Sequence, residues 1–454
     1  MRKHSITSFE EAENYINAIP RFTSKNTMED TKAFLHRLGD PDRRMRIIHI
    51  AGTNGKGSVC AYMRSILEAA GYRVALFTSP HLVDIRERFV VDKEMISKED
   101  FLRGFLRVYD MLESSDSPDE VTGLQCEFRR QACPSGYHPS YFEYLFFMAM
   151  VLFAEREPDF CILETGLGGR LDATNSVSKK ELAVITHISL DHVEYLGDTV
   201  EKIAWEKACI MQEGAPAVYW DTDASVRGVF EKKAGELGVT AYPVSKKDYR
   251  FLEFQNKSID FSVHTEYYSY ISLTLHTIAA YQMENAALAV RAVEVLDGGR
   301  TISESQIRQG VSRCFWAGRM EEVLPEVYVD GAHNEDGIRA FLETVAEDGH
   351  IGPRALLFSA VKDKDCGRMV EELVQSGLFE RVFVAHMQTE RGVSAHTFRE
   401  LFERYPGCRY RMYDNVSTAF HELLHSRRQD ERVYIAGSLY LAGEIKELLR
   451  DDKF

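Results

Sequence analysis

One stretch decides the fold: Arg46-Ile47-Ile48-His49-Ile50-Ala51-Gly52-Thr53-Asn54-Gly55-Lys56-Gly57-Ser58. An apolar run ends there in a glycine-rich turn with one lysine, and apolar residues at helical spacing follow as far as Ala70. Strand, glycine loop and helix form the setting in which backbone N–H groups and a helix N-terminus bind phosphate. We expect Lys56 to reach the outer phosphates and Ser58 to offer a hydroxyl near a metal ion. The spacing departs from G-x-x-x-x-G-K-[ST], because Gly57 separates the lysine from the serine, so an ordinary glycine-rich turn is the alternative.

Length and composition narrow the class of protein. With 454 residues the chain exceeds the size of a single core, so two or more domains are expected. The net charge of −15 argues against a broad nucleic-acid-binding surface, and no apolar run approaches the roughly 20 residues that span a bilayer. The eight cysteines include no C-x-x-C pair, and the N-terminal segment lacks the apolar core of a signal peptide. These features predict a cytoplasmic protein with reduced thiols.

Polar residues follow three further predicted strands, at 72–77, 160–164 and 182–188. The first runs into a polar turn at 78–82, the second ends on Glu164, and the third leads to Asp191 and His192. Ligands collect at the carboxyl ends of strands in open α/β sheets, and Mg²⁺ prefers one or two carboxylates with phosphate and water. Glu164 therefore predicts a metal site beside the phosphate loop. A helix-capping acid, and for His192 a structural hydrogen bond, are the alternatives.

Other elements complete the order of the first domain. The pattern predicts two helices within 7–38, a surface insertion at 114–139, helices at 141–155 and 199–211, a βα unit at 217–239, a strand meander at 249–275, and helices at 281–296 and 303–315. Lys207 lies among apolar neighbours on the helix at 199–211. A half-buried lysine near a metal can be chemically modified or shifted in pKa, whereas a surface lysine with a buried stem is the alternative.

A break at 316–319 separates a second α/β region. Strands are predicted at 326–329, 355–358, 381–385 and 433–436, alternating with helices. This alternation favours a Rossmann-like parallel sheet of about five strands, and the absence of G-x-G-x-x-G argues against a dinucleotide site. We therefore predict an α/β protein with domains at 1–315 and 316–454.

Taken together, these motifs resemble those of folylpolyglutamate synthase/dihydrofolate synthase, within the Mur ligase superfamily. The resembling segments keep the family's order: 52–58, 78–82, Leu163-Glu164-Thr165-Gly166-Leu167-Gly168-Gly169-Arg170-Leu171-Asp172-Ala173-Thr174-Asn175, 191–192, 206–208, 318–319, Asp330-Gly331-Ala332-His333-Asn334, 362–365 and 437–440. The resemblance implies a P-loop-type Mur ligase central domain that binds ATP and folate, followed by a smaller Rossmann-like glutamate ligase domain.

The implied reaction belongs to folate biosynthesis and one-carbon metabolism. ATP phosphorylates the carboxylate of a folate-type acceptor, and the amino group of L-glutamate attacks the acyl phosphate to form an amide. Because both reactants are anionic, Mg²⁺ and Lys56 must offset repulsion. The form of the segment 169–175 also resembles members that make dihydrofolate from 7,8-dihydropteroate, which implies a bifunctional enzyme.

Roles pass to this chain by match to the family's motifs. The resemblance implies ATP contacts from Thr53, Asn54, Gly55, Lys56, Gly57, Ser58, Asn285, Arg319 and Asp330. It implies two Mg²⁺ ions held by Ser79, Glu164, His192 and Lys207, with Lys207 carbamylated. It implies folate contacts from Ser140, Tyr141, Phe142, Glu143, Leu171, Asp172 and Ala173, and glutamate contacts from His333 and Ser438. The catalytic residues it implies are Lys56, His192, Lys207 and His333.

Some positions depart from the family's pattern. Tyr281 stands in place of a usual histidine, Ser359 replaces a usual glycine, and 26–29 lack the common Gly-Leu pair. Two other functions are alternatives. Another Mur-type ligase acting on a UDP-linked muramyl substrate would need a separate N-terminal domain, and a P-loop switch would bind nucleotide without ligating anything. The expected partners are small molecules (ATP, L-glutamate and folate or dihydropteroate) without nucleic acid or membrane, on a monomer.

Overall fold

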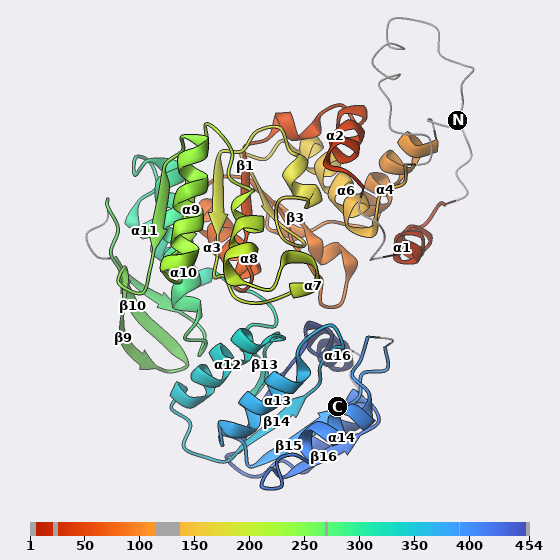
Figure 1. Ribbon diagram of the computed structural model, residues 1–454, viewed down its shortest axis with the longest axis vertical. Coiled ribbons are helices and arrows are strands. Elements are labelled where there is room, and N and C mark those ends of the chain that lie inside the picture. Colours follow the sequence, from red (N-terminus) through yellow and green to blue (C-terminus); the bar gives the residue numbers. More distant parts are fainter. Residues whose placement is uncertain (1–5, 21–25, 114–136, 268–270, 390, 451–454) are drawn as a thin grey trace, which may run out of the picture. The chain divides into compact units, whose positions relative to one another are not determined.

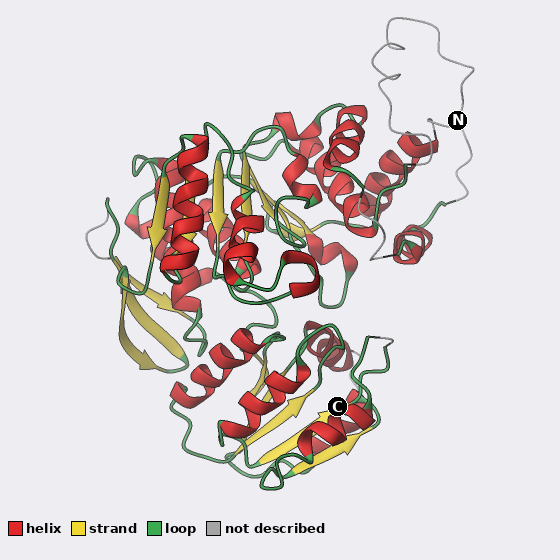
Figure 2. Cartoon of the chain, viewed as in Figure 1, coloured by secondary structure: helices red, strands yellow, loops and turns green. Residues whose placement is uncertain are grey.

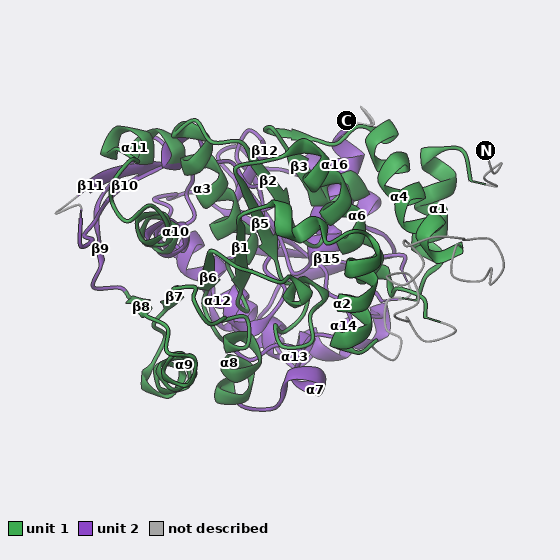
Figure 3. Cartoon of the chain, turned by 90° about the horizontal axis from the view of Figure 1, so that it is seen from above, with its two compact units in different colours: residues 1–188, 200–245, 288–310 green, residues 189–199, 246–287, 311–454 purple. Residues whose placement is uncertain are grey.

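The computed structural model describes residues 6–20, 26–113, 137–267, 271–389 and 391–450 (Figures 1 and 2). The chain forms two compact units, coloured in Figure 3: residues 1–188, 200–245 and 288–310, and residues 189–199, 246–287 and 311–454. Most of the predicted insertion, residues 114–136, lies outside the described residues. The division into domains at residue 316 stays a prediction.

An eight-stranded sheet forms the centre of the first unit. Its order is β4 (Glu94–Met95), β3 (Phe89–Val91), β2 (Val74–Phe77), β5 (Phe160–Glu164), β1 (Ile47–Ala51), β6 (Leu182–Ile185), β7 (Ala217–Trp220), β8 (Ala241–Val244). The pairs from β2 to β8 are parallel, whereas β3 and β4 add an antiparallel edge. Every residue of β1, β2, β5, β6 and β7 is buried, as expected for parallel strands covered on both faces.

The helices of the first unit lie where helices are predicted, except the one at 98–113, where none is predicted. They are α1 (Phe9–Ala18), α2 (Met28–Arg37), α3 (Lys56–Ala69), α4 (Lys98–Glu113), α6 (Tyr141–Arg156), α8 (Val200–Ala208) and α9 (Ala224–Leu237), with 3-10 turns at Pro41–Arg44, Ile85–Arg88 and Ala173–Ser176. The helix α6 is apolar on nearly every side because α1, α4 and the sheet all pack into one core with it (Figure 1). The helices α10 (Gln282–Asp297) and α11 (Glu304–Arg313) contribute residues to both units.

The second unit contains two sheets. The predicted meander is confirmed as an antiparallel sheet of β9 (Tyr249–Gln255), β10 (Ser258–Val263) and β11 (Ile271–Leu275). The other sheet has the order β12 (Glu321–Leu324), β13 (Val327–Val329), β17 (Arg432–Ala436), β14 (Arg354–Phe358), β15 (Arg381–Ala385), β16 (Tyr410–Tyr413). Its strands from β13 to β16 are parallel, which confirms the predicted Rossmann-like sheet, and β12 adds an antiparallel edge.

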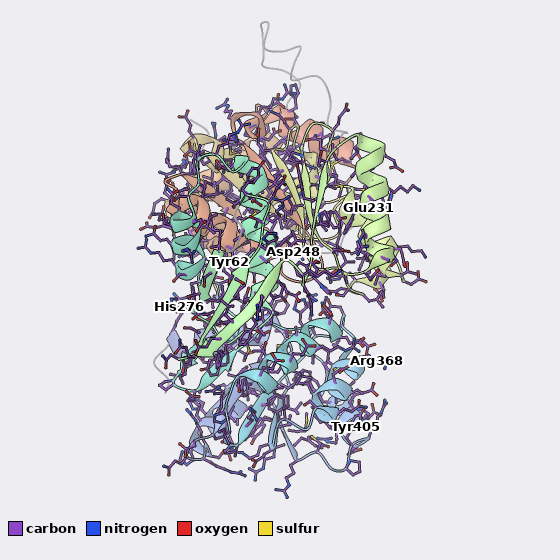
Figure 4. The ribbon with its side chains drawn as sticks, turned by 90° about the vertical axis from the view of Figure 1, so that its left-hand side faces the viewer. Tyr62, Glu231, Asp248, His276, Arg368 and Tyr405 are labelled. Carbon is purple, nitrogen blue, oxygen red and sulfur yellow. The ribbon has the colours of Figure 1, made fainter. Side chains whose placement is uncertain are left out.

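The helices of the second unit are α7 (Val193–Leu196), α12 (Glu335–Glu347), α13 (Cys366–Gln375), α14 (Ala395–Phe402), α15 (Val416–His425) and α16 (Leu439–Arg450). The meander packs on this unit, because Phe254 of β9 joins the core beneath α12. His276, marked in Figure 4, lies 3.1 Å from the Ser258 hydroxyl and 3.0 Å from the Ser312 hydroxyl. Among the helices that the structure describes, none combines the length and apolarity needed to cross a bilayer.

Candidate active-site residues in the two units

The loop between β1 and α3 is clamped onto the end of β6. Gly52 has φ +153°, and a Cβ at this position would lie 1.7 Å from the Thr186 hydroxyl oxygen, so only glycine fits. That hydroxyl donates to the Asn54 carbonyl at 2.6 Å, and the Thr53 amide donates to the His187 carbonyl at 2.8 Å. The 14-residue helix α3 begins at Lys56, directly after the loop. This arrangement places a helix N-terminus, which favours anions, where the sequence predicts phosphate.

Two lysines converge on one carbonyl oxygen of this loop. Lys56 Nζ donates to the carbonyls of Gly52 and Thr53, both at 3.1 Å. Lys207 Nζ, from α8, donates to the same Gly52 oxygen at 2.7 Å, and its side chain is buried. The structure therefore brings together the lysine predicted to bind phosphate and the lysine predicted to be modified. Two ammonium groups held this close repel each other, so a bound anion would stabilise the arrangement.

Glu164 lies beside the loop. It ends β5, whose backbone pairs with β1 at Ile50, and it is buried. Its Oε2 accepts a hydrogen bond of 2.9 Å from the Ser79 amide, so the structure brings these two predicted metal ligands together. Within the described ranges, no three His, Cys, Asp or Glu side chains cluster as a metal site. A cation here would need the Ser79 hydroxyl, nucleotide and water beside Glu164, and such oxygen-rich coordination suits Mg²⁺.

The second glycine-rich loop is closed by Asp172. Its Oδ2 accepts hydrogen bonds of 2.9 Å from the amides of Gly166 and Leu167. Its Oδ1 accepts from the Thr174 amide at 3.0 Å and from the Thr174 hydroxyl at 2.6 Å. Asp172 and Ala173 are buried, whereas Leu171 is exposed. The Asp172 carboxylate therefore shapes this loop through at least four hydrogen bonds.

The start of α6 contacts that loop directly. A Cβ on Gly166 would lie 2.8 Å from the ring of Phe142, so the second glycine-rich loop touches a residue predicted to bind folate. Ser140 and Glu143 form a reciprocal capping box, in which the Ser140 amide donates to Glu143 Oε2 at 2.7 Å. The same carboxylate accepts from the Asn26 amide group at 2.7 Å and the Thr31 hydroxyl at 3.0 Å. Glu143 thereby ties α2 to α6.

A charged residue that sequence reasoning missed lies against Tyr141. The Arg88 guanidinium lies 5.7 Å from the centre of the Tyr141 ring, and Arg88 Nε donates to His81 Nδ1 at 2.9 Å. Arg88 is buried although it is an arginine. Arg88 ends the 3-10 turn at Ile85–Arg88 and directly precedes the short strand pair β3 and β4, for which the sequence shows no clear pattern.

In the second unit, a polar cluster surrounds Asp191. Lys364 Nζ lies 2.5 Å from Asp191 Oδ1 and 3.2 Å from His192 Nε2, and the Asn334 side-chain amide donates to Asp191 Oδ2 at 3.0 Å. Burial alone would raise the pKa of Asp191, but Lys364 and the neighbouring histidines hold it well below its usual value. Burial and Lys364 lower the pKa of His333 to about 4, so His333 is neutral at pH 7. Sequence reasoning gave no role to Lys364, although it lies within a segment that carries the family resemblance.

Asp330 closes a loop after β13. Its Oδ2 accepts from the Tyr281 hydroxyl at 2.5 Å and the Met320 amide at 2.9 Å, and its Oδ1 accepts from the Ala332 amide at 2.8 Å. Tyr281, which replaces the family's usual histidine, therefore holds one of the predicted nucleotide residues.

The other predicted residues of the second unit also make local contacts. The Arg319 guanidinium donates to the Gly318 carbonyl at 3.2 Å, and the Asn285 side-chain amide donates to Gln282 Oε1 at 3.1 Å. His333 and Ser438 follow β13 and β17, which are parallel neighbours. The structure therefore places both predicted glutamate residues after strands that end at the same edge of the sheet.

Comparison with known proteins identifies the class. Residues 108–293 match the Mur ligase middle domain, and residues 318–439 match the Mur ligase glutamate ligase domain. The fold and these matches define an ATP-dependent ligase of the Mur ligase class. Over 454 residues the chain is 32% identical to dihydrofolate synthase/folylpolyglutamate synthase of Bacillus subtilis (strain 168), covering 98% of this chain and 100% of that protein. The chain belongs to the dihydrofolate synthase/folylpolyglutamate synthase family.

Solved structures agree with this assignment. E. coli FolC in complex with DHPP and ADP superposes with a TM-score of 0.83 at 25% identity, covering 100% of both chains. A folylpolyglutamate synthase complex with AMPPCP and folate gives a TM-score of 0.81 at 26% identity, covering 98% of this chain and 100% of the other. The predicted family, fold class and ligase activity are confirmed.

Proposed function

We propose that this protein joins the amino group of L-glutamate to the carboxylate of reduced folates and of 7,8-dihydropteroate, through an acyl phosphate formed from ATP. One observation carries the proposal. The parallel strands β1 and β5 are adjacent in the sheet. β1 leads into the loop 52–58, which is predicted to bind phosphate, and β5 leads into the loop 165–175, which contacts Phe142. A nucleotide and an acceptor carboxylate bound at these loops would therefore lie at neighbouring strand ends. Relatives solved with ADP and DHPP, or with AMPPCP and folate, support this choice of ligands.

In the first unit, the loop residues 53–58 hold the phosphates of ATP through backbone N–H groups and Lys56. The Lys56 ammonium stabilises the charge that develops on the transferred phosphoryl group. The segments 140–143 and 171–173 bind the pterin acceptor, with Leu171 as their exposed apolar member and Asp172 as the residue that shapes the loop.

Metal binding is assigned to Ser79, Glu164, His192 and Lys207, with two Mg²⁺ ions. Bound there, Mg²⁺ would neutralise phosphate charge and orient the phosphate oxygens. Lys207 would act as a ligand after carbamylation, in which its neutral amine adds to CO2 and loses a proton, leaving an anionic carbamate. The close approach of Lys56 supports this, because a carbamate there turns repulsion into attraction. His192 can coordinate through Nε2 only after Lys364 Nζ leaves that nitrogen.

In the second unit, His333 and Ser438 bind glutamate, while Asn285, Arg319 and Asp330 contact the nucleotide. His333 Nδ1 lies 2.7 Å from the Gly331 carbonyl, which as an acceptor requires an N–H there. The other nitrogen, Nε2, therefore carries a lone pair in the neutral ring. It can accept a hydrogen bond from the amino group of glutamate and orient that group toward the acyl phosphate, whereas a ring with a pKa of about 4 is too weak a base to deprotonate an ammonium group.

We also propose that the enzyme acts as a cytoplasmic monomer. Cysteine use supports the location, since the six cysteines in the described part of the chain carry free thiols.

The deciding experiment measures phosphate release with Mg²⁺-ATP and L-glutamate, comparing 7,8-dihydropteroate with tetrahydrofolate as the acceptor and weighing the products by mass spectrometry. Turnover of both acceptors, each gaining one glutamate, is the expected result. Turnover of tetrahydrofolate alone would remove the dihydrofolate synthase assignment. ATP hydrolysis that is indifferent to both acceptors would favour the nucleotide-switch alternative.

A further inference from the structure

His49 is a polar residue in an otherwise apolar strand. It lies in the middle of β1, fully buried, between Leu163 of β5 and Ala183 of β6. Burying an imidazole in a sheet costs free energy unless the ring makes a hydrogen bond. No role for His49 follows from phosphate binding, because its side chain lies three residues before the glycine loop begins.

Among the residues that the structure describes, the ring makes one hydrogen bond, and its partner belongs to the second loop. His49 Nε2 lies 2.7 Å from the hydroxyl oxygen of Thr174, which is itself fully buried. The same hydroxyl lies 2.6 Å from Asp172 Oδ1. Asp172 in turn holds the amides of Gly166 and Leu167. A continuous chain of hydrogen bonds therefore runs from the centre of β1 to the loop that contacts Phe142.

The direction of each hydrogen bond in this chain is fixed. Three backbone N–H donors stabilise the Asp172 carboxylate as an anion, which can only accept. The single hydroxyl proton of Thr174 must point at Asp172, so His49 must donate to Thr174 from Nε2. His49 Nδ1 then carries a lone pair, and this atom is buried without a hydrogen-bond partner among the residues that the structure describes. Burial, with a smaller effect of Lys180, lowers the pKa of His49 well below its usual value, so the ring is neutral.

We propose that His49 is a positioning residue for the acceptor substrate: through Thr174 it fixes Asp172, and so the second loop, to the strand that carries the nucleotide loop. Phosphoryl transfer needs the reacting atoms within about 3–3.5 Å of each other. A hydrogen-bonded link between β1 and the loop 165–175 would keep that loop at a fixed distance from the loop 52–58. The proposal rests on the proposed function, since it takes the loop 165–175 as part of the pterin site.

Four variants test the link as two matched pairs. Glutamine can place its amide N–H where Nε2 lies, whereas asparagine reaches only as far as Nδ1, so His49→Gln keeps the donor and His49→Asn removes it. Thr174→Ser keeps the hydroxyl and Thr174→Val removes it at nearly the same volume. We expect His49→Asn and Thr174→Val to raise the KM for tetrahydrofolate about tenfold while the KM for ATP changes less than twofold. His49→Gln and Thr174→Ser should stay within threefold of the parent protein.

The double variant His49→Asn/Thr174→Val should be no worse than the poorer single variant, because both substitutions break one link. The proposal would be overturned if the two single-variant increases in the KM for tetrahydrofolate multiplied in the double variant. Equal losses in His49→Gln and His49→Asn would also overturn it, as would a matching rise in the KM for ATP. If His49→Asn fails to fold, the threonine pair alone carries the test, since a serine or valine leaves the strand intact.

A measurement without substrate separates this proposal from the proposed function. Hydrogen–deuterium exchange of the peptide covering 165–175 should be at least tenfold faster in His49→Asn and Thr174→Val than in their matched partners. Unchanged exchange in all four variants would overturn the link even if tetrahydrofolate is a substrate. Faster exchange in a protein that never turns over a pterin would uphold the link and reject the proposed function.

Discussion

The two units build their polar sites in different ways. In the first, the phosphate-type loop comes from one short segment, and its shape is set by glycine backbone and by Thr186. In the second, the cluster around Asp191 gathers side chains from three distant segments, at Asp191, Asn334 and Lys364. The first site depends on local geometry and the second on charge balance. Substitutions should therefore damage the first site by changing backbone conformation and packing, and the second site by removing a charge partner.

Lys56→Ala should cause the largest loss. Removing a preorganised positive group from transferring phosphate costs about 10³-fold in kcat. Because the hydrogen bonds that Lys56 makes in the described part of the chain go to loop carbonyls, of Gly52 and Thr53, the melting temperature should change little. Steady-state kinetics with thermal denaturation checks both. Near-normal turnover would show that the phosphate site lies elsewhere.

Gly52→Ala should disrupt the same loop through its backbone. The new Cβ would overlap the Thr186 hydroxyl, 1.7 Å away, at a φ of +153°. We expect the free energy of unfolding to fall by about 4 kcal/mol, from overpacking and backbone strain together. Gly71→Ala is the control, since Gly71 has φ +94° but nothing within 4 Å of the added Cβ. Urea denaturation measures the free energy of unfolding of both variants. If both lose the same amount, the overlap with Thr186 is not the cause of the loss.

Lys364→Met should destabilise the second unit by leaving the Asp191 carboxylate buried without its nearest cation. The side chains of Lys364 and Asp191 are 6% and 10% exposed, so screening by water is weak. Breaking such a pair costs about 3 kcal/mol, and the pKa of Asp191 should rise toward its usual value. Lys362→Met, at an exposed position of the same turn, is the control. If urea denaturation shows both variants equally stable, the cluster is not held by this pair.

The smallest expected effect is the contribution of His49 to the pH dependence of folding stability. Its pKa is lowered in the folded protein from a usual value of 6.5, so below pH 6.5 the unfolded chain binds a proton that the folded chain refuses. Stability should therefore fall with decreasing pH by up to about 1.4 kcal/mol per unit. His49→Gln should lose this part of the slope between pH 6.5 and 5, while the part from His333 remains in both proteins. Parallel curves for the two proteins would contradict a neutral, buried His49.

Most secondary-structure elements and motifs that lie within one short segment are predictable from the sequence. The strand, loop and helix at 47–69 are predictable because glycine spacing and apolar periodicity lie within one short segment, and Glu164 is predictable because it ends an apolar strand. The short strands β3, β4, β8, β12 and β16, which lie at or next to the edges of their sheets, are not predicted, since they bury too few side chains to show an alternating pattern. The helix α4 was missed although Phe101, Phe105 and Val108 have helical spacing, so a usable signal was present there.

Contacts between distant segments could not be predicted. His49 and Thr174 are 125 residues apart, and Asp191 and Lys364 are 173 apart, so no spacing rule joins them. The roles assigned to individual site residues stay predictions for the same reason: the motif match names a residue, while its environment depends on the whole fold. Asp172 illustrates this, because a motif cannot tell a carboxylate that faces a ligand from one that closes its own loop.

The central position of β1 also bears on how the chain is made. Ile48 pairs with Ile162 on one side and with Leu182 on the other, so both neighbours of this strand are synthesised more than a hundred residues later. At about 5–20 residues per second, an apolar strand waits roughly 6 to 30 s on the ribosome for its partners. During that interval its unpaired edges are open to other chains, which makes the nascent protein a candidate client for chaperones.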